Sequence, residues 1–565
     1  MNLHDYLKEH VLIADGSMGT YYSSLVKKDG ELSELGNLSA PKLIEQIHKE
    51  YISAGARLLR TNTFAANRRV LQVDKDMQEK IIRTACAIAK KAAYESENLL
   101  AEGEKVWILG DIGPIIEDAN SSEADVLEEY KLICDIFHDE GLDGIHFETM
   151  TNVNYIEKLI PYIREIWPEA FILASFSVNM NGYSLDGISA ARLLERTGQI
   201  DGIDACGLNC GIGSGHMYKL LKNISFPSGK FAYASPNAGY PEQMQNRMVF
   251  IDNALYFTEN MKKIAGLSLN IIGGCCGTTP DYIKNLARQI RTNGYKIKRP
   301  RVTVRTLEKI TPVRENEFYQ LFDSGKKVMA VELDPPYNAE IDKIMECAHK
   351  IKNIGADIIT IADSPMGRSR VDSILMSIKI AEDTGLRVMP HICCRDRNMI
   401  AMRSSLLGAY IHGIRNLLIV TGDPVPGENR TKITGVFDYN SIQLMNYVKE
   451  MNEELFINDP LYYGGALNQG RGNLDKIIER MQRKVDAGAS YFLTQPVYSD
   501  EDIQRIAYIK ERVDTKILCG IMPFVSYKNA NFIKNEVTGI FVPDEVIARY
   551  RPDMSREEAE LTGAQ

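Results

Sequence analysis

The sequence has no long hydrophobic run and no excess of positive charge. No stretch of about 18 apolar residues occurs in the 565-residue chain, so a membrane-spanning helix is not expected. The net charge is −9, which argues against nucleic acid as a main partner. The first residues show neither a basic start nor an apolar run, so no signal peptide is expected. The sequence therefore predicts a globular protein that binds neither a membrane nor nucleic acid.

The sequence also lacks the cysteine spacing of a disulfide scaffold. Its ten cysteines are scattered, which fits a reducing compartment and predicts a cytoplasmic location. With 44% hydrophobic and 25% charged residues, the chain is too long for one core. Two or three globular domains are expected.

One local pattern recurs in both halves of the chain. A glycine is followed by a short apolar run that ends in a polar residue, as seen after Gly55, Gly141, Gly355 and Gly488. Glycine can end a helix in a left-handed cap. The short apolar run suits a strand buried on both faces of a parallel sheet. The pattern therefore predicts repeated helix–strand units.

Counting such strands predicts two barrels. Eight strands are expected in the first half, near residues 11–17, 58–64, 106–113, 144–150, 171–178, 204–211, 231–239 and 267–276. Seven are expected in the second half, near residues 328–333, 357–363, 387–394, 416–423, 461–468, 490–497 and 516–523. The predicted fold is α/β, with two TIM-type (β/α)₈ barrels in tandem, the second lacking its last strand.

The predicted domains are residues 1–295 and 315–565, joined by a linker at 296–314. A capping box at Ser555 opens a helix near the end of the sequence. We expect this helix to fray, because no strand follows it.

Three cysteines end strands of the first predicted barrel. Cys210 ends the sixth strand, while Cys275 and Cys276 end the eighth, so all three are expected on one rim. Three thiolates suit zinc, and a fourth, open position is typical of a catalytic site. A substrate thiol would bind there as a thiolate, which suggests alkyl transfer to sulfur. The alternative is that the adjacent cysteines are small buried residues beside a tight turn.

Polar residues end other strands of this barrel, namely Asp15, the Thr61–Thr63 run and Glu148. Together with the cysteines, these motifs resemble the homocysteine S-methyltransferase family over about residues 1–295. The resemblance implies zinc held by Cys210, Cys275 and Cys276. It also implies that Asp15 and Glu148 receive the amino group of homocysteine. S-adenosylmethionine, S-methylmethionine and methyltetrahydrofolate remain open as methyl donors.

One residue departs from this family pattern. Arg60 stands directly before the Thr-Asn-Thr-Phe run, where many relatives carry an acidic or amide residue.

Motifs at the predicted strand ends of the second half occur in a recognisable order. Glu332 ends the first strand, His391 the third, Asp423 the fourth and Gln495 the sixth, and Tyr527 follows the seventh. This order resembles the methylenetetrahydrofolate reductase family over about residues 315–565. The resemblance implies bound FAD and a folate substrate.

The resemblance also implies roles for these residues. Glu332 would protonate the folate and open its five-membered ring before hydride passes from the reduced flavin. Asp423 would lie near the flavin ring and tune its electronics, and Gln495 and Tyr527 would hold the folate. The other residues implied to contact FAD are His391, Thr421, Gly422, Ala466, Asn468, Arg483 and Lys484. NAD(P)H or another electron donor would reduce the flavin.

The order of the two halves resembles fusions of these two families, which implies an enzyme with two reactions of methionine and one-carbon metabolism. The alternative is a zinc methyltransferase whose second barrel only binds flavin or folate, or serves as a scaffold. Glu332, Asp423 and Gln495 favour catalysis, whereas the missing strand favours the alternative. The sequence patterns indicate no oligomeric state.

Overall fold

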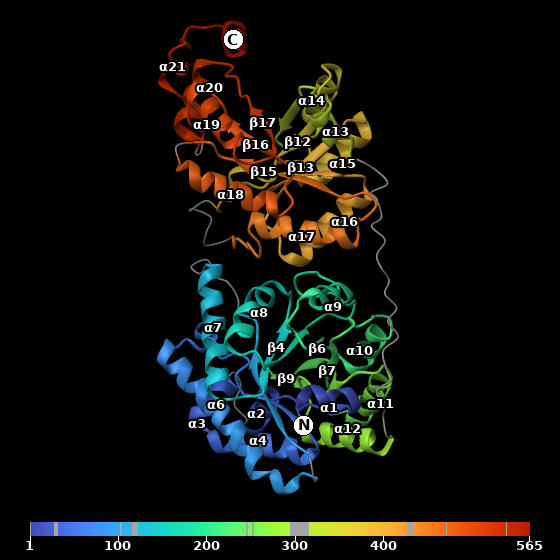
Figure 1. The fold of residues 1–565 in the computed structure, drawn as a ribbon. Helices are drawn as coiled ribbons and strands as arrows, with labels where there is room; N and C mark the ends of the chain where they lie inside the picture. Colours follow the sequence, from blue (N-terminus) through green and yellow to red (C-terminus); the bar gives the residue numbers. More distant parts are fainter. Residues whose placement is uncertain are drawn as a thin grey trace. The chain divides into compact units, whose positions relative to one another are not determined.

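The computed structural model describes residues 2–26, 32–101, 104–115, 122–244, 247–250, 253–293, 316–425, 433–470, 472–537 and 540–565. The chain divides into two compact units, 1–306 and 307–565, each an α/β structure around a parallel sheet (Figure 1). The predicted linker at 296–314 lies outside the described residues. No helix in the described ranges is both long and apolar enough to cross a membrane.

The first unit contains an eight-stranded parallel sheet with the order β1-β10-β7-β6-β5-β4-β3-β2. Its strands are β1 (Leu12–Ile13), β2 (Leu58–Arg60), β3 (Trp107–Ile112), β4 (Gly144–Met150), β5 (Phe171–Phe176), β6 (Ala205–Gly213), β7 (Phe231–Asn237) and β10 (Ile271–Ile272). Hydrogen bonds from Arg57 N to Ile13 O (2.8 Å) and from Asp15 N to Leu58 O (2.9 Å) join β1 to β2. The sheet therefore closes into a barrel, and the eight predicted strands are confirmed.

Helices cover this barrel. The longer ones are α4 (Pro41–Ala54), α6 (Lys75–Glu95), α7 (Glu123–Asp139), α8 (Asn154–Ile166), α9 (Ala190–Gln199), α11 (Ala254–Ala265) and α12 (Pro280–Asn293). The shorter ones are α1 (Leu3–Glu9), α2 (Gly19–Val26), α3 (Gly36–Ser39), α5 (Arg68–Leu71) and α10 (Ser214–Leu221), with 3₁₀ turns η1 (Ser33–Leu35) and η2 (Glu97–Leu99). Gly55 ends α4 with a φ of 109°, the left-handed cap that the sequence predicts.

An antiparallel hairpin follows β7, formed by β8 (Pro241–Met244) and β9 (Arg247–Phe250). The helix–strand pattern did not predict this insertion.

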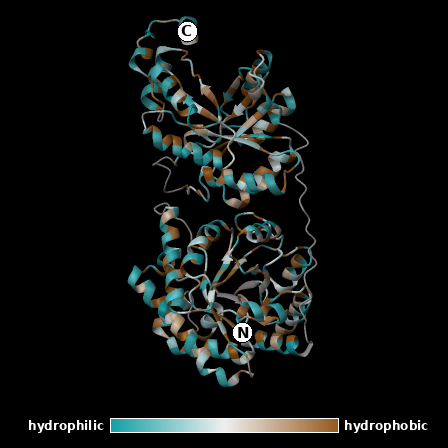
Figure 2. Cartoon of the chain, viewed as in Figure 1, coloured by the Kyte–Doolittle hydropathy of each residue, from teal (hydrophilic) through white to brown (hydrophobic). Residues whose placement is uncertain are grey.

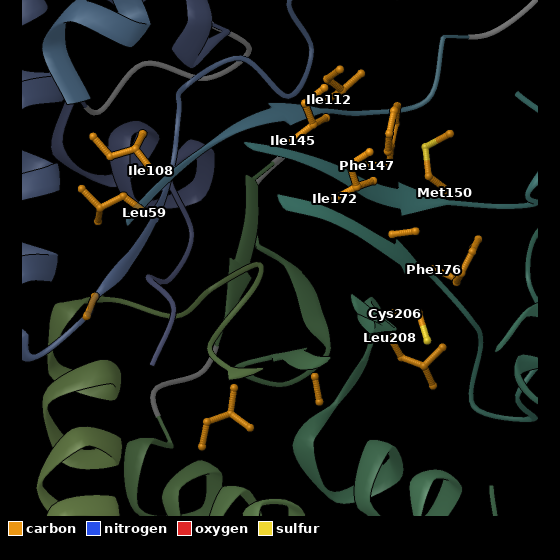
Figure 3. Close-up of a cluster of buried hydrophobic side chains, with 14 of the residues drawn as sticks. Leu59, Ile108, Ile112, Ile145, Phe147, Met150, Ile172, Phe176, Cys206 and Leu208 are labelled. Atoms are coloured by element: carbon orange, nitrogen blue, oxygen red, sulfur yellow. The ribbon is translucent and has the colours of Figure 1, made fainter. Parts of the chain in front are cut away.

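Side chains alternate between the two faces of the first sheet, as the pleat requires. One buried cluster includes Leu58 and Leu109, and Leu3 and Leu7 of α1 pack against it. Alternate residues of the same strands, for example Ile108, face the other way and belong to a second buried cluster under the helices. Figure 3 shows this second cluster along β2 to β6. The barrel interior therefore has its own core, which α1 covers at the amino ends of the strands.

The second unit contains a seven-stranded parallel sheet in simple sequence order. Its strands are β11 (Ala330–Leu333), β12 (Ile358–Ile361), β13 (Val388–Cys393), β14 (Asn416–Val420), β15 (Tyr462–Leu467), β16 (Tyr491–Pro496) and β17 (Lys516–Gly520). Within the described part of this unit, no strand joins β17 to β11. The prediction of seven strands and an incomplete barrel is confirmed.

The described part of the second unit also contains helices and one 3₁₀ turn. They are α13 (Glu317–Asp323), α14 (Asp342–Asn353), α15 (Ser373–Thr384), α16 (Met399–Ile411), α17 (Ser441–Glu454), α18 (Leu474–Asp486), α19 (Asp500–Lys510), α20 (Tyr527–Glu536), α21 (Asp544–Ile547) and α22 (Arg556–Ala564), with the 3₁₀ turn η3 (Pro365–Gly367). Figure 2 shows hydrophilic and hydrophobic residues along the same helices, as expected for amphipathic helices that cover a sheet.

The last helix differs from the sequence expectation. Ser555 forms the predicted capping box with Glu558, and Ala559 of α22 is buried in a small cluster with Phe524 and Tyr550. We expected this helix to fray because no strand follows it, but residues earlier in the same unit pack against Ala559.

Candidate active sites

The three predicted zinc ligands converge on the carboxyl-terminal rim of the first barrel. Cys210 lies near the end of β6, and Cys275 and Cys276 follow β10. Their sulfur atoms all lie within 4.8 Å of one another, and those of Cys210 and Cys276 are 3.6 Å apart. Two thiolates on a tetrahedral zinc are about 3.8 Å apart, given a Zn–S bond of about 2.3 Å. The spacing therefore fits a zinc ion.

The backbone around these cysteines is shaped to bring the sulfur atoms together. Cys210 has a φ of 54°, a left-handed conformation that is uncommon outside glycine. Gly211 follows with a φ of 68°, and a Cβ at this position would lie 2.3 Å from the carbonyl oxygen of Val178. Residues are held in such conformations only when the surrounding structure fixes them, which is common at functional sites.

Hydrogen bonds hold the loop that carries the other two cysteines. Cys275 N donates to Pro236 O (2.9 Å), and Ala238 N donates to Cys276 O (2.9 Å). Thr278 Oγ1 donates to Cys275 O at 2.7 Å. The loop is therefore fastened to β7 and to its own backbone, which orders the two sulfur atoms.

The crowded thiols differ in acidity. Hydrogen bonds from Cys275 and Cys276 lower the pKa of Cys210 to about 3. The bond that Cys275 makes to Cys210, together with burial and the nearby negative charge, raises the pKa of Cys275 to about 12. Cys210 therefore loses its proton first, and its negative charge opposes the loss of a proton from Cys275. A metal cation among the three sulfur atoms would favour the thiolate form of each.

Asp15 and Glu148, the predicted receptors of the amino group, also lie on this rim, and Arg60 bridges them. Asp15 is 3% exposed, Glu148 5% and Arg60 7%. Arg60 Nε donates to Asp15 Oδ1 (2.7 Å), its backbone N donates to Asp15 Oδ2 (3.0 Å), and Nη1 donates to Glu148 Oε1. The sequence showed that Arg60 departs from the family pattern, but it did not predict that Arg60 pairs with both carboxylates.

Burial dominates the electrostatics of these groups. Desolvation raises the pKa of Asp15 and of Glu148, and the Arg60 guanidinium partly offsets that rise. The pKa of Asp111, at the end of β3, is raised well above its usual range by burial and by the charge of Glu148. Burial lowers the pKa of His146, so its ring is neutral.

A chain of hydrogen bonds links the carboxylates to the cysteines. Asn209 Nδ2 donates to Glu148 Oε1 (3.1 Å) and lies 3.8 Å from Cys275 Sγ. Ser175 Oγ donates to Asn209 Oδ1 (2.7 Å) and lies 2.8 Å from His146 Nε2. The sequence analysis missed Asn209, although its position beside a predicted metal ligand was a signal.

In the second unit, the predicted residues lie at or just beyond the carboxyl ends of the strands. Glu332 on β11 and Asp423 after β14 are exposed, and Asp423 Oδ2 accepts from Met366 N at 2.8 Å. Gln495 on β16 and Tyr527 at the start of α20 are half-buried. These four residues lie at one end of the sheet, and their carboxylate, amide and phenol groups can form hydrogen bonds to a substrate.

The residues implied to contact FAD divide into buried and exposed ones. His391 on β13 is buried, and its Nε2 has no hydrogen-bond partner within the described ranges. Lys484 on α18 is 8% exposed and donates to Ala466 O (3.1 Å), and burial lowers its pKa to about 8. The exposed residues of the set are Thr421, Asn468 and Arg483, and Gly422 is half-buried.

Two family models match the chain. Residues 12–290 match "Homocysteine S-methyltransferase", and residues 317–563 match "Methylenetetrahydrofolate reductase". The two matches do not overlap and follow the two structural units.

Curated relatives match about half of the chain. A methionine synthase of Mycobacterium leprae (strain TN) is 28% identical over 315 residues, covering 51% of this chain and 25% of that protein. A methionine synthase of Mycobacterium tuberculosis (strain ATCC 25618 / H37Rv) is 29% identical over 323 residues, covering 53% and 26%. The matches thus span about a quarter of the length of these relatives.

Solved structures are also similar. The metallated form of the homocysteine methyltransferase MmuM from Escherichia coli is 21% identical, with a TM-score of 0.42, covering 50% of this chain and 97% of that one. Its apo form is 22% identical, with a TM-score of 0.40, covering 51% and 98%.

Proposed function

We propose that the chain catalyses two reactions, one in each half, because residues 12–290 match the homocysteine S-methyltransferase family model and residues 317–563 match the methylenetetrahydrofolate reductase model. The first is methyl transfer to the sulfur of homocysteine, giving methionine. The second is reduction of 5,10-methylenetetrahydrofolate to 5-methyltetrahydrofolate. We assign the domains to residues 1–295 and 315–565, with 296–314 as the linker. The convergence of Cys210, Cys275 and Cys276 carries this proposal.

Zinc is the proposed metal of the first domain, and these three cysteines would hold it. The sulfur spacing and the stabilisation that a cation would give three thiolates both support this assignment. A bound zinc ion would supply Lewis acidity, which lowers the pKa of a thiol at its open position.

The protein side chains of the first site would place the amino-acid end of homocysteine. Glu148 Oε1 lies 3.9 Å from Cys275 Sγ, so a carboxylate stands directly beside the sulfur cluster. A carboxylate there can accept hydrogen bonds from an ammonium group. We therefore assign the amino group of homocysteine to the Asp15 and Glu148 side of the site.

FAD is the proposed cofactor of the second domain, where it would supply hydride transfer. The buried Nε2 of His391, which lacks a partner in the described part of the chain, supports a bound group at this end of the sheet. We assign FAD contacts to His391, Thr421, Gly422, Asp423, Ala466, Asn468, Arg483 and Lys484.

The roles proposed for the substrate side of this domain rest on the resemblance to the methylenetetrahydrofolate reductase family. Glu332 would donate the proton that opens the folate ring, and Gln495 and Tyr527 would hold the folate. Among the described strands, β11 and β17 each have a neighbour on one side only, and this favours the second candidate, a reductase-like domain that binds flavin or folate without catalysis. Assay of methylenetetrahydrofolate reduction by the full chain separates the two candidates.

A cysteine substitution tests the first activity. Cys276→Ala is expected to lose most of its zinc and its methyl transfer to homocysteine, because only two of the three thiolates remain. The matched control is Cys206→Ala, the same change on the same strand as Cys210 but outside the sulfur cluster. Zinc would be measured by elemental analysis. Full zinc content and unchanged activity in Cys276→Ala would reject the metal site.

A further inference from the structure

Arg60 donates a hydrogen bond to each of the two carboxylate oxygens of Asp15. Asp15 Oδ1 accepts from Arg60 Nε at 2.7 Å, and Asp15 Oδ2 accepts from the backbone N of Arg60 at 3.0 Å. Both oxygens of Asp15 are therefore engaged by a buried cation and its own backbone. A substrate ammonium could reach Asp15 only by displacing a guanidinium from a buried, charge-assisted pair, which is costly.

Glu148 is engaged differently. In the described residues, N–H donors reach it only at Oε1, from Arg60 Nη1 and from Asn209 Nδ2 (3.1 Å). The Asp111 carboxyl is a further hydrogen-bond partner of Glu148, and this partner carries no positive charge. Glu148 therefore shares one oxygen with Arg60, whereas both oxygens of Asp15 accept from Arg60. The same carboxylate stands 3.9 Å from Cys275 Sγ, on the side of the site where a thiol substrate would bind.

Arg60 also reaches the loop that carries two of the cysteines. Its Nη2 donates to Gly16 O (2.8 Å) and to Gly274 O (3.0 Å), and Gly274 directly precedes Cys275. The planar fork of one guanidinium thus ties the end of β2 to the loops after β1 and β10. A lysine could not make these bonds together, because it lacks the fork.

We propose that Arg60 is a positioning residue with two effects on the proposed homocysteine site. It withdraws Asp15 from the substrate, which leaves Glu148 as the carboxylate that receives the ammonium group, and it fixes the Gly274–Cys275 segment. This inference rests on the proposed function, and it divides the roles of two carboxylates that the resemblance treats alike.

The test compares two thiols that differ only in the amino group. Homocysteine and 4-mercaptobutanoate share the chain length, the thiol and the carboxylate. Their dissociation constants would be measured by titration calorimetry with the zinc-loaded full chain. The ratio of the two constants reports recognition of the ammonium group, whereas an equal change in both constants reports a shift of the site as a whole.

Glu148→Gln is expected to cut the preference for homocysteine by roughly 10- to 100-fold, the usual effect of losing a charge-assisted hydrogen bond. Asp15→Asn is expected to weaken both thiols by a similar factor, with the preference kept within about threefold. Arg60→Met frees Asp15 for the substrate, so this variant is expected to raise the preference for homocysteine. Arg60→Lys keeps a cation beside Asp15 but lacks the planar fork, so it serves for the zinc-release measurement if the methionine variant fails to fold.

Zinc release to a chelator gives a readout that needs no substrate. Arg60→Met is expected to release zinc faster, because Gly274 loses its bond beside Cys275. The matched control is Arg57→Met, just before the same strand. Arg57 is also 7% exposed, and it pairs with Glu104 and donates to the carbonyls of Ile52 and Ala56. This control is expected to release zinc at the wild-type rate.

Three results would overturn parts of this inference. An equal loss of preference in Asp15→Asn and Glu148→Gln would show that Asp15 contacts the ammonium group. Unchanged thiol affinity and zinc release in Arg60→Met would remove its positioning role. A wild-type chain that binds zinc but neither thiol would reject the proposed function together with the role of Glu148, while faster zinc release from Arg60→Met would still uphold the positioning of the cysteine loop.

Discussion

At the scale of single residues, the rim of the first barrel concentrates buried charge. Asp111 is 4% exposed, its Oδ1 has no hydrogen-bond partner in the described chain, and this atom lies 3.9 Å from His146 Nδ1. Burial and the charge of Glu148 raise the pKa of Asp111 well above its usual range. The folded protein therefore keeps a proton on Asp111 at a pH where the unfolded chain has lost it.

This proton predicts how stability depends on pH. A carboxyl whose pKa is higher in the folded state stabilises the fold fully below its unfolded pKa of about 4, and this contribution is lost as the pH rises through the folded pKa. Asp111→Asn keeps the shape but cannot ionise. Its free energy of unfolding relative to wild type should therefore increase with pH above about 4, by up to about 1.4 kcal/mol per pH unit.

Urea unfolding of the first unit at pH 5, 6 and 7 would measure this difference. Asp139→Asn, a surface change on α7, is the control and should follow the wild-type profile. Parallel pH profiles for wild type and Asp111→Asn would mean that Asp111 is ionised in the folded protein.

A second residue-scale prediction concerns Glu332. Glu332→Gln keeps the side-chain shape but cannot donate a proton, so folate reduction should fall about 10²- to 10⁴-fold, the usual worth of general acid catalysis. FAD should stay bound, which the flavin absorbance of the purified protein would show. Glu340→Gln, an exposed change in the loop before α14, is the control. Activity within a few-fold of wild type in a folded Glu332→Gln protein would remove Glu332 from this role.

At the scale of elements, the two sheets differ in how their strands are flanked. β6 pairs with β5 and β7, whereas β17 pairs with β16 alone among the described strands. On an edge strand, alternate backbone N–H groups point away from the neighbouring strand and are not bonded to it. β17 also has no fully buried residue, whereas β6 is largely buried. We therefore expect β17 to be the least stable strand of the second unit.

Hydrogen exchange can measure this difference. Amides of residues 516–565 should exchange faster than those of residues 204–276, with the largest contrast between β17 and β6. Within β17, the amides that face away from β16 should exchange fastest. Ala559 of α22 is buried, so we expect the amides around it to be better protected than those of β17. Equal protection of β17 and β6 would show that another segment or a partner covers this edge.

At the scale of the whole molecule, each unit has its own core. The buried clusters of the first unit contain residues between Leu3 and Ile290, and those of the second contain residues between Phe318 and Ala559. Two units with separate cores are expected to fold independently.

The fragment 1–306 tests this independence. It should fold when expressed alone, bind zinc, and unfold within about 4 °C of the matching transition in the full chain, because a shift of that size corresponds to only about 1 kcal/mol. Calorimetry and metal analysis would measure both properties. An insoluble fragment, or one that unfolds far below the full chain, would show that the second unit stabilises the first.

The strand layout and the place of the three cysteines could be predicted from local sequence patterns. Glycine at helix ends and short apolar runs between helices are local signals, and they located fifteen strands and the left-handed caps at Gly55, Gly141, Gly355 and Gly488. The barrel rule then placed Cys210, Cys275 and Cys276 on one rim. These features follow from backbone conformation and from periodic burial, which are encoded over a few residues at a time.

The pairing of charges at that rim could not be predicted from the sequence, because it depends on contacts across the folded barrel. Arg60 and Glu148 are 88 residues apart, and no local pattern reports which cation meets which carboxylate across a barrel. The same holds for Asn209, whose amide reaches from the strand of one cysteine to the sulfur of another. Buried charges take the partners that lie within hydrogen-bond distance, and those distances are set by packing of the whole barrel.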